Sequence, residues 1–342
     1  MWRSCWRVAV LLGLLGTAAG CGGGESGPRG SGGGSGPTVG PGVDPTDRPT
    51  LRTVLYLPSW RGSLSTWTRQ LRFSNLSYVN LSFAEIDDAG TVRYPDAGLS
   101  AFVTNVHAAG AKVCVAIGGA TTIENGGVFA TLLQDAQRPQ LVANLVKFAK
   151  DNQLDCLDVD LEGNGVNEYY EAFVTELAAG LKAENLELTA AVAAWFGEKI
   201  TTKALLAFDF INVMAYDLYM RRETPMQWSS IEAATIEVDR WVGKGMPKDR
   251  VVYGVPFYGM QWPAGGGEPK TIGYGELLRA DTAAETQDLL QGNGTITYLN
   301  SRSTIQAKAL LAKEYGGIMA WEATQDAAGD ASLLQAIRDA VP

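Results

Sequence analysis

The feature of this 342-residue chain that most constrains its fold is a repeated alternation of short apolar runs with amphipathic stretches. Helical patterns cover residues 139–152, 167–184, 231–243, 303–315 and 331–341. Eight further runs are rich in aliphatic and β-branched residues, as is typical of buried strands. These runs are Thr53–Leu57, Tyr78–Phe83, Lys112–Ile117, Leu154–Leu161, Leu186–Ala194, Phe210–Ala215, Val251–Phe257 and Gly317–Trp321.

Eight strand–helix units of about 36 residues each predict an α/β fold, the closed (β/α)8 TIM barrel. An open doubly wound sheet is the alternative. No Gly-x-Gly-x-x-Gly motif follows the first predicted strand, so the usual signature of a dinucleotide-binding sheet is missing. In a barrel the reactive groups lie at the carboxyl ends of the strands, and the candidate site is expected there.

The first 50 residues have a different composition from the rest. Residues 1–20 place Arg3 and Arg7 before a short apolar run, which predicts a secretory signal peptide rather than a membrane-spanning helix. Its end, Ala18-Ala19-Gly20-Cys21, resembles a bacterial lipobox, and that resemblance implies lipidation of Cys21; a plain cleaved signal peptide is the alternative. Residues 21–50 are rich in Gly, Pro and Ser and predict a flexible tether.

These segments predict an exported protein, either lipid-anchored in a bacterial cell envelope or secreted, with the membrane as a partner in the first case. Residues 51–342 are then one domain, which we expect to be a monomer. Two of its cysteines, Cys114 and Cys156, lie inside apolar runs, where buried free thiols are the default expectation.

Composition narrows the chemistry. The single histidine, His107, excludes a Ser-His-Asp triad and any site built from several histidines. The net charge of −9 argues against a nucleic-acid-binding surface. We expect no cofactor and no metal, so the chemistry has to come from carboxylates, tyrosines and tryptophans.

The fourth predicted strand carries three acids on one face. Asp158, Asp160 and Glu162 alternate with aliphatic residues, and side chains two apart on a strand point the same way. Like charges at close range raise a carboxyl pKa, which keeps an acid protonated near neutral pH and able to donate a proton. A calcium loop and a salt-bridged structural strand are the alternatives; the spacing lacks the Gly and Glu positions of an EF-hand loop.

The spacing from Asp155 to Glu162 resembles the D-x-x-D-x-D-x-E signature of family 18 glycoside hydrolases, the chitinase-like enzymes. Motifs at five other predicted strands are similar to that family, in the same order along the chain. They are Tyr56–Trp60, Ala116–Gly119, Val213–Asp217, Gly254–Gly259 and Gly316–Trp321. The resemblance covers residues 53 to about 340.

The resemblance implies retaining hydrolysis of β-1,4 bonds next to N-acetylglucosamine, with the acetamido oxygen of the substrate as nucleophile. It implies four catalytic residues: Glu162 as general acid and base, Asp160 as the partner of the acetamido N–H, Asp158 sharing a proton with Asp160, and Tyr216 donating to the acetamido oxygen. It also implies a set of substrate-binding residues, with Trp321 as the floor beneath the sugar. This set is Asp217, Trp321, Tyr56, Trp60, Phe83 and Met214.

The sequence departs from the family pattern at three places. Cys156 replaces a glycine, Ala116 replaces a serine, and Gly163-Asn164 replaces Tyr-Pro. The missing serine normally supports the aspartate that corresponds to Asp158, which leaves Tyr56 or a water for that task. If Ala116 lies level with Asp158, Cys114 lies level with Cys156 about 4.8 Å away, so we expect the two thiols to touch inside the barrel. Their redox state stays open.

The stretch between the last two predicted strands is short. Residues 260–302 provide about 43 residues, with a hairpin expected near Gly292-Asn293-Gly294. This is a small insertion, which favours a shallow groove, so chitin, chito-oligosaccharides and N-glycan cores all remain candidate substrates. An endo-β-N-acetylglucosaminidase is one alternative function. A non-catalytic glycan-binding lectin is another, disfavoured because Glu162, Asp160 and Tyr216 are all present.

Overall fold

The computed structural model describes residues 51–218 and 224–341. The signal peptide, Cys21 and the tether predicted for residues 1–50 lie outside the described residues. Among the described helices, none is long and apolar enough to cross a membrane.

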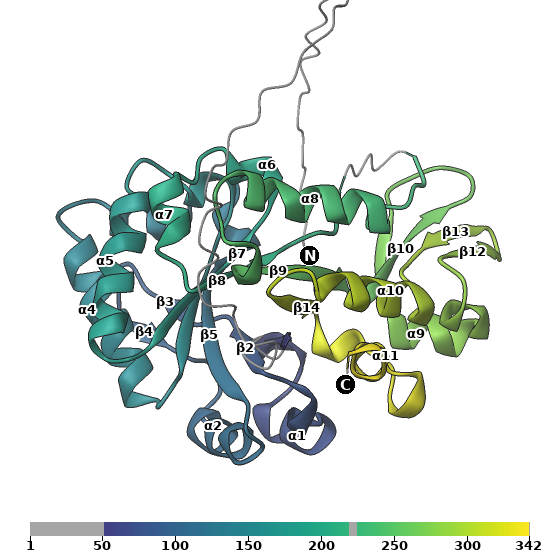
Figure 1. The fold of residues 1–342 in the computed structure, drawn as a ribbon, viewed down its shortest axis with the longest axis horizontal. Helices are drawn as coiled ribbons and strands as arrows, with labels where there is room; N and C mark the ends of the chain where they lie inside the picture. The colour runs from purple at the N-terminus through teal and green to yellow at the C-terminus, as the bar shows by residue number, and fades with distance from the viewer. Residues whose placement is uncertain (1–50, 219–223, 342) are drawn as a thin grey trace, which may run out of the picture. The chain divides into compact units, whose positions relative to one another are not determined.

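Eight parallel strands close into a barrel, which confirms the predicted fold (Figure 1). The strands in chain order are β1 (Arg52–Pro58), β2 (Tyr78–Ser82), β5 (Lys112–Gly119), β6 (Cys156–Leu161), β7 (Glu187–Val192), β8 (Phe210–Val213), β9 (Val251–Pro256) and β14 (Gly317–Trp321). Around the barrel they run in the order β1-β14-β9-β8-β7-β6-β5-β2. Each predicted strand corresponds to one of these strands, with ends that agree to within two residues.

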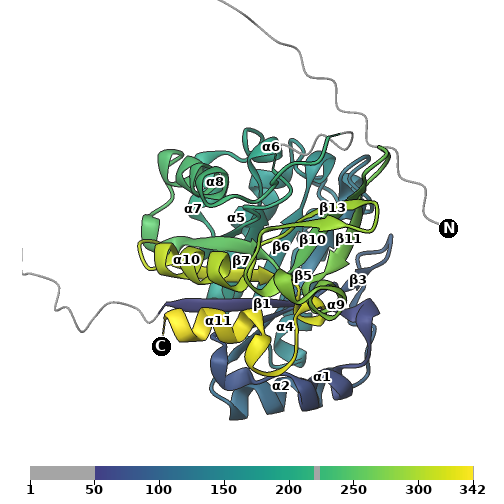
Figure 2. The ribbon, with the colours of Figure 1, turned by 90° about the vertical axis from the view of Figure 1, so that its right-hand side faces the viewer.

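Helices pack around the outside of the barrel (Figures 1 and 2). They are α1 (Leu64–Gln70), α2 (Leu99–Ala108), α3 (Phe129–Leu132), α4 (Arg138–Asp151), α5 (Tyr170–Ala183), α6 (Ala194–Gly197), α7 (Thr202–Leu206), α8 (Ile231–Gly243), α10 (Arg302–Ala312) and α11 (Leu333–Ala340); a further helix, α9 (Tyr274–Ala280), lies within the insertion between β9 and β14. The start of α8 shows how the sequence fixes a boundary: the Ser230 hydroxyl accepts a hydrogen bond from the Ala233 N–H at 3.1 Å. Its buried residues, among them Val238 and Trp241, then recur at helical spacing.

A small antiparallel sheet is inserted between β9 and β14. Its strands are β10 (Tyr258–Pro263), β11 (Lys270–Gly273), β12 (Leu289–Gly292) and β13 (Thr295–Tyr298), in the order β11-β10-β13-β12. The predicted hairpin is confirmed: Asn293 and Gly294 have φ values of 49° and 71°, the left-handed conformation that a tight turn requires. A second, two-stranded hairpin, β3 (Glu85–Ile86) and β4 (Val92–Arg93), follows β2.

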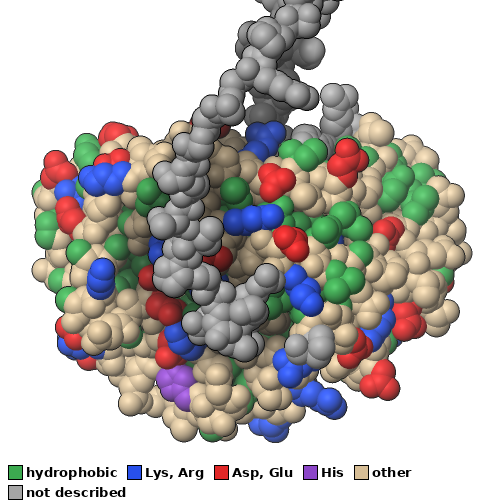
Figure 3. Space-filling view, viewed as in Figure 1, with side chains coloured by type: hydrophobic (Ala, Val, Ile, Leu, Met, Phe, Trp, Pro, Cys, Tyr) green, Lys and Arg blue, Asp and Glu red, His purple; other side chains and the backbone are tan. Residues whose placement is uncertain are grey.

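The apolar core has two parts because alternate residues of each barrel strand face opposite ways. One part lies between strands and helices and includes Val115 and Leu157. The other lies inside the barrel and includes Cys114, Ala116 and Cys156. The outer surface seen in Figure 3 intersperses acidic and basic side chains.

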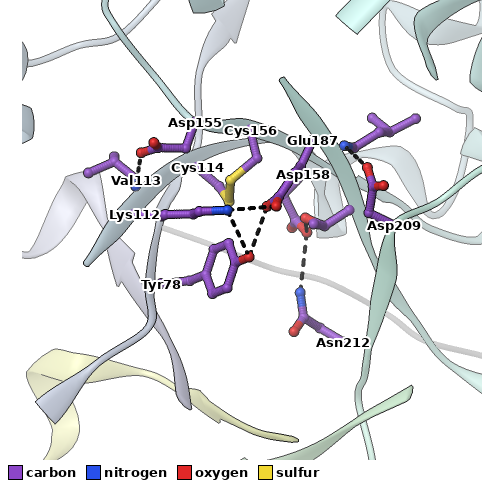
Figure 4. Close-up of a disulfide and its surroundings, with 12 residues drawn as sticks. Tyr78, Lys112, Val113, Cys114, Asp155, Cys156, Asp158, Glu187, Asp209 and Asn212 are labelled. Carbon is purple, nitrogen blue, oxygen red and sulfur yellow. Dashed lines mark hydrogen bonds and ion pairs between the residues drawn. A yellow bond between two sulfur atoms is a disulfide. The ribbon is translucent and has the colours of Figure 1, made fainter. Parts of the chain in front are cut away.

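Cys114 and Cys156 are joined as a disulfide inside the barrel, with their Cα atoms 4.5 Å apart (Figure 4). This confirms the expectation that the two sulfurs touch, and it corrects the expectation of free thiols. The physical reason is register: the two cysteines are direct partners on neighbouring strands.

Candidate active site

Strand β6 sets the level of each acid inside the barrel. Its neighbour β5 pairs Ala116 with Asp158 and Gly118 with Asp160, as the sequence predicted for Ala116. Gly118 has φ +106°, and a Cβ there would lie 2.4 Å from the Asp160 carbonyl oxygen. Position 118 therefore requires glycine, and its lack of a side chain lets β5 pack against the strand that carries the acids.

Asp158 is fully enclosed and accepts three hydrogen bonds. The Tyr56 hydroxyl donates to Oδ2 at 2.7 Å, and Thr189 Oγ1 donates to Oδ1 at 2.5 Å. Asn212 Nδ2 also donates to Oδ1, at 3.3 Å (Figure 4). Burial raises the Asp158 carboxyl pKa and these hydrogen bonds oppose the rise, leaving the pKa above its ordinary value.

Tyr56 therefore supports Asp158, as the loss of the serine led us to expect. Thr189 and Asn212 are partners that the sequence reasoning missed. Each was visible as a polar residue at an inward-facing position of an otherwise apolar predicted strand. Tyr56 is only 1% exposed, and its hydroxyl donates to Asp158 and accepts a hydrogen bond from Asn212.

Asp160 lies one step closer to the carboxyl end of the barrel and is also buried. Its Oδ1 has no hydrogen-bond partner among the described residues. Burial raises its carboxyl pKa well above the usual range, and the charges of Glu162 and Asp158 raise it further. Both shifts favour a protonated carboxyl within the pair of Asp158 and Asp160.

Glu162 directly follows β6 and is partly buried. Its backbone N–H donates to Thr122 Oγ1 at 2.8 Å, and Thr122 donates to the Gly119 carbonyl at 2.9 Å, which fastens the end of β6 to the end of β5. Burial, followed by the charge of Asp217, raises the pKa of the Glu162 carboxyl to about 7. Such a group is available as an acid and as a base near neutral pH.

Tyr216 and Asp217 follow β8 and extend the site. Burial raises the Tyr216 pKa well above its usual range, so its hydroxyl remains a donor; it lies 4.0 Å from the Met319 sulfur. Asp217 has a φ of 58° and accepts a hydrogen bond from the Tyr258 hydroxyl at 2.7 Å. Met214 precedes them and is partly buried against the interior cluster.

Aromatic rings gather at the ends of β1, β2 and β14. Trp321 lies 5.5 Å from Tyr56 and 6.4 Å from Phe83, measured between ring centroids. Phe83 in turn stacks on Trp60 at 6.0 Å, and Trp60 is 57% exposed. A half-buried ring with an exposed neighbour suits a sugar face, which is flat and apolar.

Three other tryptophans, Trp195, Trp228 and Trp262, differ from one another in their exposure to solvent. Trp228 is buried and stacks on Tyr258 at 4.8 Å, and Trp262 is buried within the insertion. Trp195, in α6 shortly after β7, is 56% exposed. The geometry thus makes Trp228 and Trp262 packing residues and brings the predicted site residues together at the carboxyl ends of the strands.

Comparison with known proteins agrees with this geometry. The model of the family Glycosyl hydrolases family 18 matches residues 52–326. Among solved structures, the family 18 chitinase ChiB from the chitin utilization locus of Flavobacterium johnsoniae aligns with a TM-score of 0.76 and 32% identity, covering 85% of this chain and 94% of that one.

Two curated relatives are more distant. A chitinase-like effector of Moniliophthora roreri is 28% identical over 243 residues, which cover 60% of this chain and 57% of that protein. A probable endochitinase of Caenorhabditis elegans is 28% identical over 244 residues, which cover 54% of this chain and 39% of that protein. The chain thus spans roughly half the length of these relatives. Since the family model covers most of the barrel, including every strand that carries the acids and aromatics, the chain belongs to glycosyl hydrolase family 18.

Proposed function

We propose that the protein is a retaining glycoside hydrolase that cleaves β-1,4 bonds next to N-acetylglucosamine in chitin or chito-oligosaccharides. The observation that carries this proposal is a row of three acids: Asp158 and Asp160 are enclosed on β6, and the partly buried Glu162 directly follows them. Burial and the charge of Asp217 raise the carboxyl pKa of Glu162 to about 7. A carboxyl whose pKa lies near neutrality can give a proton to a leaving oxygen and later take one from water.

The proposed reaction begins when Glu162 protonates the glycosidic oxygen as the bond to the anomeric carbon breaks. The acetamido oxygen of the same sugar attacks that carbon from the other side, with Asp160 accepting the acetamido N–H and Tyr216 donating to the acetamido oxygen. Glu162 then takes a proton from a water molecule, which attacks the anomeric carbon as the bond from that carbon to the acetamido oxygen breaks and the acetamide is restored. Two inversions give net retention.

The aromatic group supports binding of the sugar at the reacting position. Trp321 would lie beneath the ring, with Phe83 and Trp60 extending an apolar surface away from it. Asp217, held by the Tyr258 hydroxyl, and Met214 would border the same sugar from the β8 side. Stacking of this kind holds the scissile bond in place against Glu162.

A substrate panel tests the proposal. Wild type and Glu162→Gln are assayed on chito-oligosaccharides, colloidal chitin and a high-mannose glycopeptide. We expect wild type to cleave the first two, with kcat/KM falling as pH rises through about 7, and Glu162→Gln to lose roughly 10³-fold. Cleavage of the glycopeptide alone would instead identify an endo-β-N-acetylglucosaminidase, and binding without cleavage would identify a lectin.

We also propose that the protein is exported and carries a lipid on Cys21. The support is the sequence of residues 1–21. Metabolic labelling with a fatty-acid analogue tests this: wild type should incorporate the label, Cys21→Ser should not, and labelling of both would contradict it.

A further inference from the structure

Asp158 has different neighbours on its two sides. On β5 its register partner is Ala116, which offers no side-chain donor. On β7 its register partner is Thr189, fully buried, whose Oγ1 donates to Asp158 Oδ1 at 2.5 Å. The donor that one strand lacks is therefore supplied at the same level by the strand on the opposite side.

We propose that Thr189 is a positioning residue, whose hydroxyl keeps the negative charge of the Asp158 and Asp160 pair on Asp158 and the proton on Asp160. The proposal rests on the proposed hydrolysis, because it concerns how the pair is prepared for the substrate. It assigns Thr189 a role in ionisation that packing alone does not require.

The hydrogen bonds around the two acids are unequal. Both oxygens of Asp158 receive donors, whereas Oδ1 of Asp160 has no partner among the described residues. Donors favour the ionised form of a carboxyl, and two adjacent buried acids resist carrying two charges. The single charge therefore lies on Asp158, and Asp160 keeps the proton.

Of the three donors to Asp158, Thr189 makes the shortest hydrogen bond, whereas the Asn212 amide is shared. Asn212 Nδ2 is shared between Asp158, at 3.3 Å, and the Tyr56 hydroxyl, at 3.2 Å. Thr189 makes the shortest of the three hydrogen bonds to Asp158, 2.5 Å against 2.7 Å for Tyr56. Its loss should thus weaken the preference for charge on Asp158.

The position of the proton in the Asp158 and Asp160 pair also affects the ionisation of Glu162. The Asp160 carboxyl lies between Asp158 and Glu162 along β6, and the charge of Glu162 acts on it directly. When Asp160 carries the proton, ionised Glu162 lies next to a neutral carboxyl. The acetamido group of a substrate then always contacts Asp160 in its protonated form. If the charge moved to Asp160, it would oppose ionisation of Glu162.

The test first removes the Thr189 hydroxyl and then places a hydroxyl on the other side of Asp158, at position 116. In Thr189→Val we expect the acid limb of the kcat/KM profile to shift upward by about one pH unit, because the pair takes up a second proton more easily. We expect kcat to fall roughly tenfold and KM to change less than twofold. Thr189→Ser keeps the donor and should restore the wild-type profile.

The decisive variant is Ala116→Ser in the Thr189→Val background. Position 116 faces Asp158 from β5, so the new hydroxyl should return the acid limb toward its wild-type position. The matched control is Thr297→Val, another buried threonine, which accepts a hydrogen bond from Gln261 in the insertion; its pH profile should match wild type.

Carboxyl ¹³C NMR titration of Asp158 and Asp160 follows the protonation of the pair directly and needs no substrate. If wild type hydrolyses no substrate, the proposed function fails, and the NMR titration still decides where Thr189 keeps the charge. The inference is overturned if Thr189→Val titrates like wild type, or if Ala116→Ser in the Thr189→Val background fails to reverse the shift.

Discussion

At one end of the barrel interior the charged side chains have oppositely charged partners, whereas three acids at the other end have none among the described residues. At the amino-terminal end of the strands, Lys112 Nζ lies 2.6 Å from Glu187 Oε1, and the Tyr78 hydroxyl donates to Glu187 at 2.9 Å (Figure 4). At the carboxyl end, Asp158, Asp160 and Glu162 have no ion pair within the described part of the chain. The Cys114–Cys156 disulfide lies between the two ends, one inward-facing position above Lys112 and one below Ala116.

This difference separates what stabilises the fold from what would do the chemistry. A charge with a nearby partner costs little to bury partly, whereas adjacent enclosed carboxylates repel one another and oppose folding. Sites that carry such a cost are usually functional. The comparison predicts that changes at the carboxyl end alter activity, and that changes at the amino-terminal end and at the disulfide alter stability.

The largest expected effect is at Asp160. Asp160→Asn removes the group that holds the proton beside Glu162, and we expect kcat/KM on chito-oligosaccharides to fall by about 10² to 10³. The matched change at the other end, Glu187→Gln, should keep kcat within about twofold. The proposed difference between the two ends is wrong if Asp160→Asn retains more than a tenth of wild-type activity, or if Glu187→Gln lowers activity as much as Asp160→Asn does.

The second effect concerns the disulfide. The two cysteines are 42 residues apart in sequence, a loop whose cross-link contributes about 3 to 4 kcal/mol to the free energy of unfolding. The double variant Cys114→Ala/Cys156→Ala should lose about this amount in urea denaturation. A reductant should lower the stability of wild type and leave the variant unchanged; equal stability of the two proteins would show that the cross-link does not contribute.

The smallest effect is at the amino-terminal ion pair. Lys112 and Glu187 have side chains that are 44% and 30% exposed, so water and salt screen their attraction. Lys112→Met should lower the free energy of unfolding by about 1 kcal/mol, less in high salt, with unchanged kcat. A change in kcat beyond threefold would mean that the two ends are coupled.

The sequence predicts the fold well because the barrel repeats a strong local signal. Runs such as 251–257 and 317–321 are apolar, β-branched and bounded by polar or glycine residues, so their ends are marked locally. The alternation of acids on β6 also predicts which face they share. Even the contact of Cys114 with Cys156 follows once a single register pair is assumed.

The parts that escape sequence reasoning depend on contacts between elements that are far apart in the sequence. That Thr189 and Asn212 both reach Asp158 follows from the stagger of three strands, which no single strand encodes. The tryptophans show the same limit: Trp60 and Trp228 each lie in the connection between a barrel strand and the following helix, yet Trp60 is exposed and Trp228 is buried against Tyr258. The burial of Trp228 depends on β10, an element from a distant part of the chain.

One measurement tests most directly whether the acids at the carboxyl end are uncompensated: the free energy of unfolding of wild type and Glu162→Gln as a function of pH. The folded-state pKa of Glu162 is about 7, against 4.5 for an unperturbed glutamate, so the folded protein keeps a proton that the unfolded chain releases between these values. Wild type should therefore lose stability as pH rises from about 4.5 to 7, and the glutamine variant should lose less. We predict that the variant gains roughly 1 to 2 kcal/mol on wild type between pH 5 and 8. A difference that stays constant across this range would contradict the account.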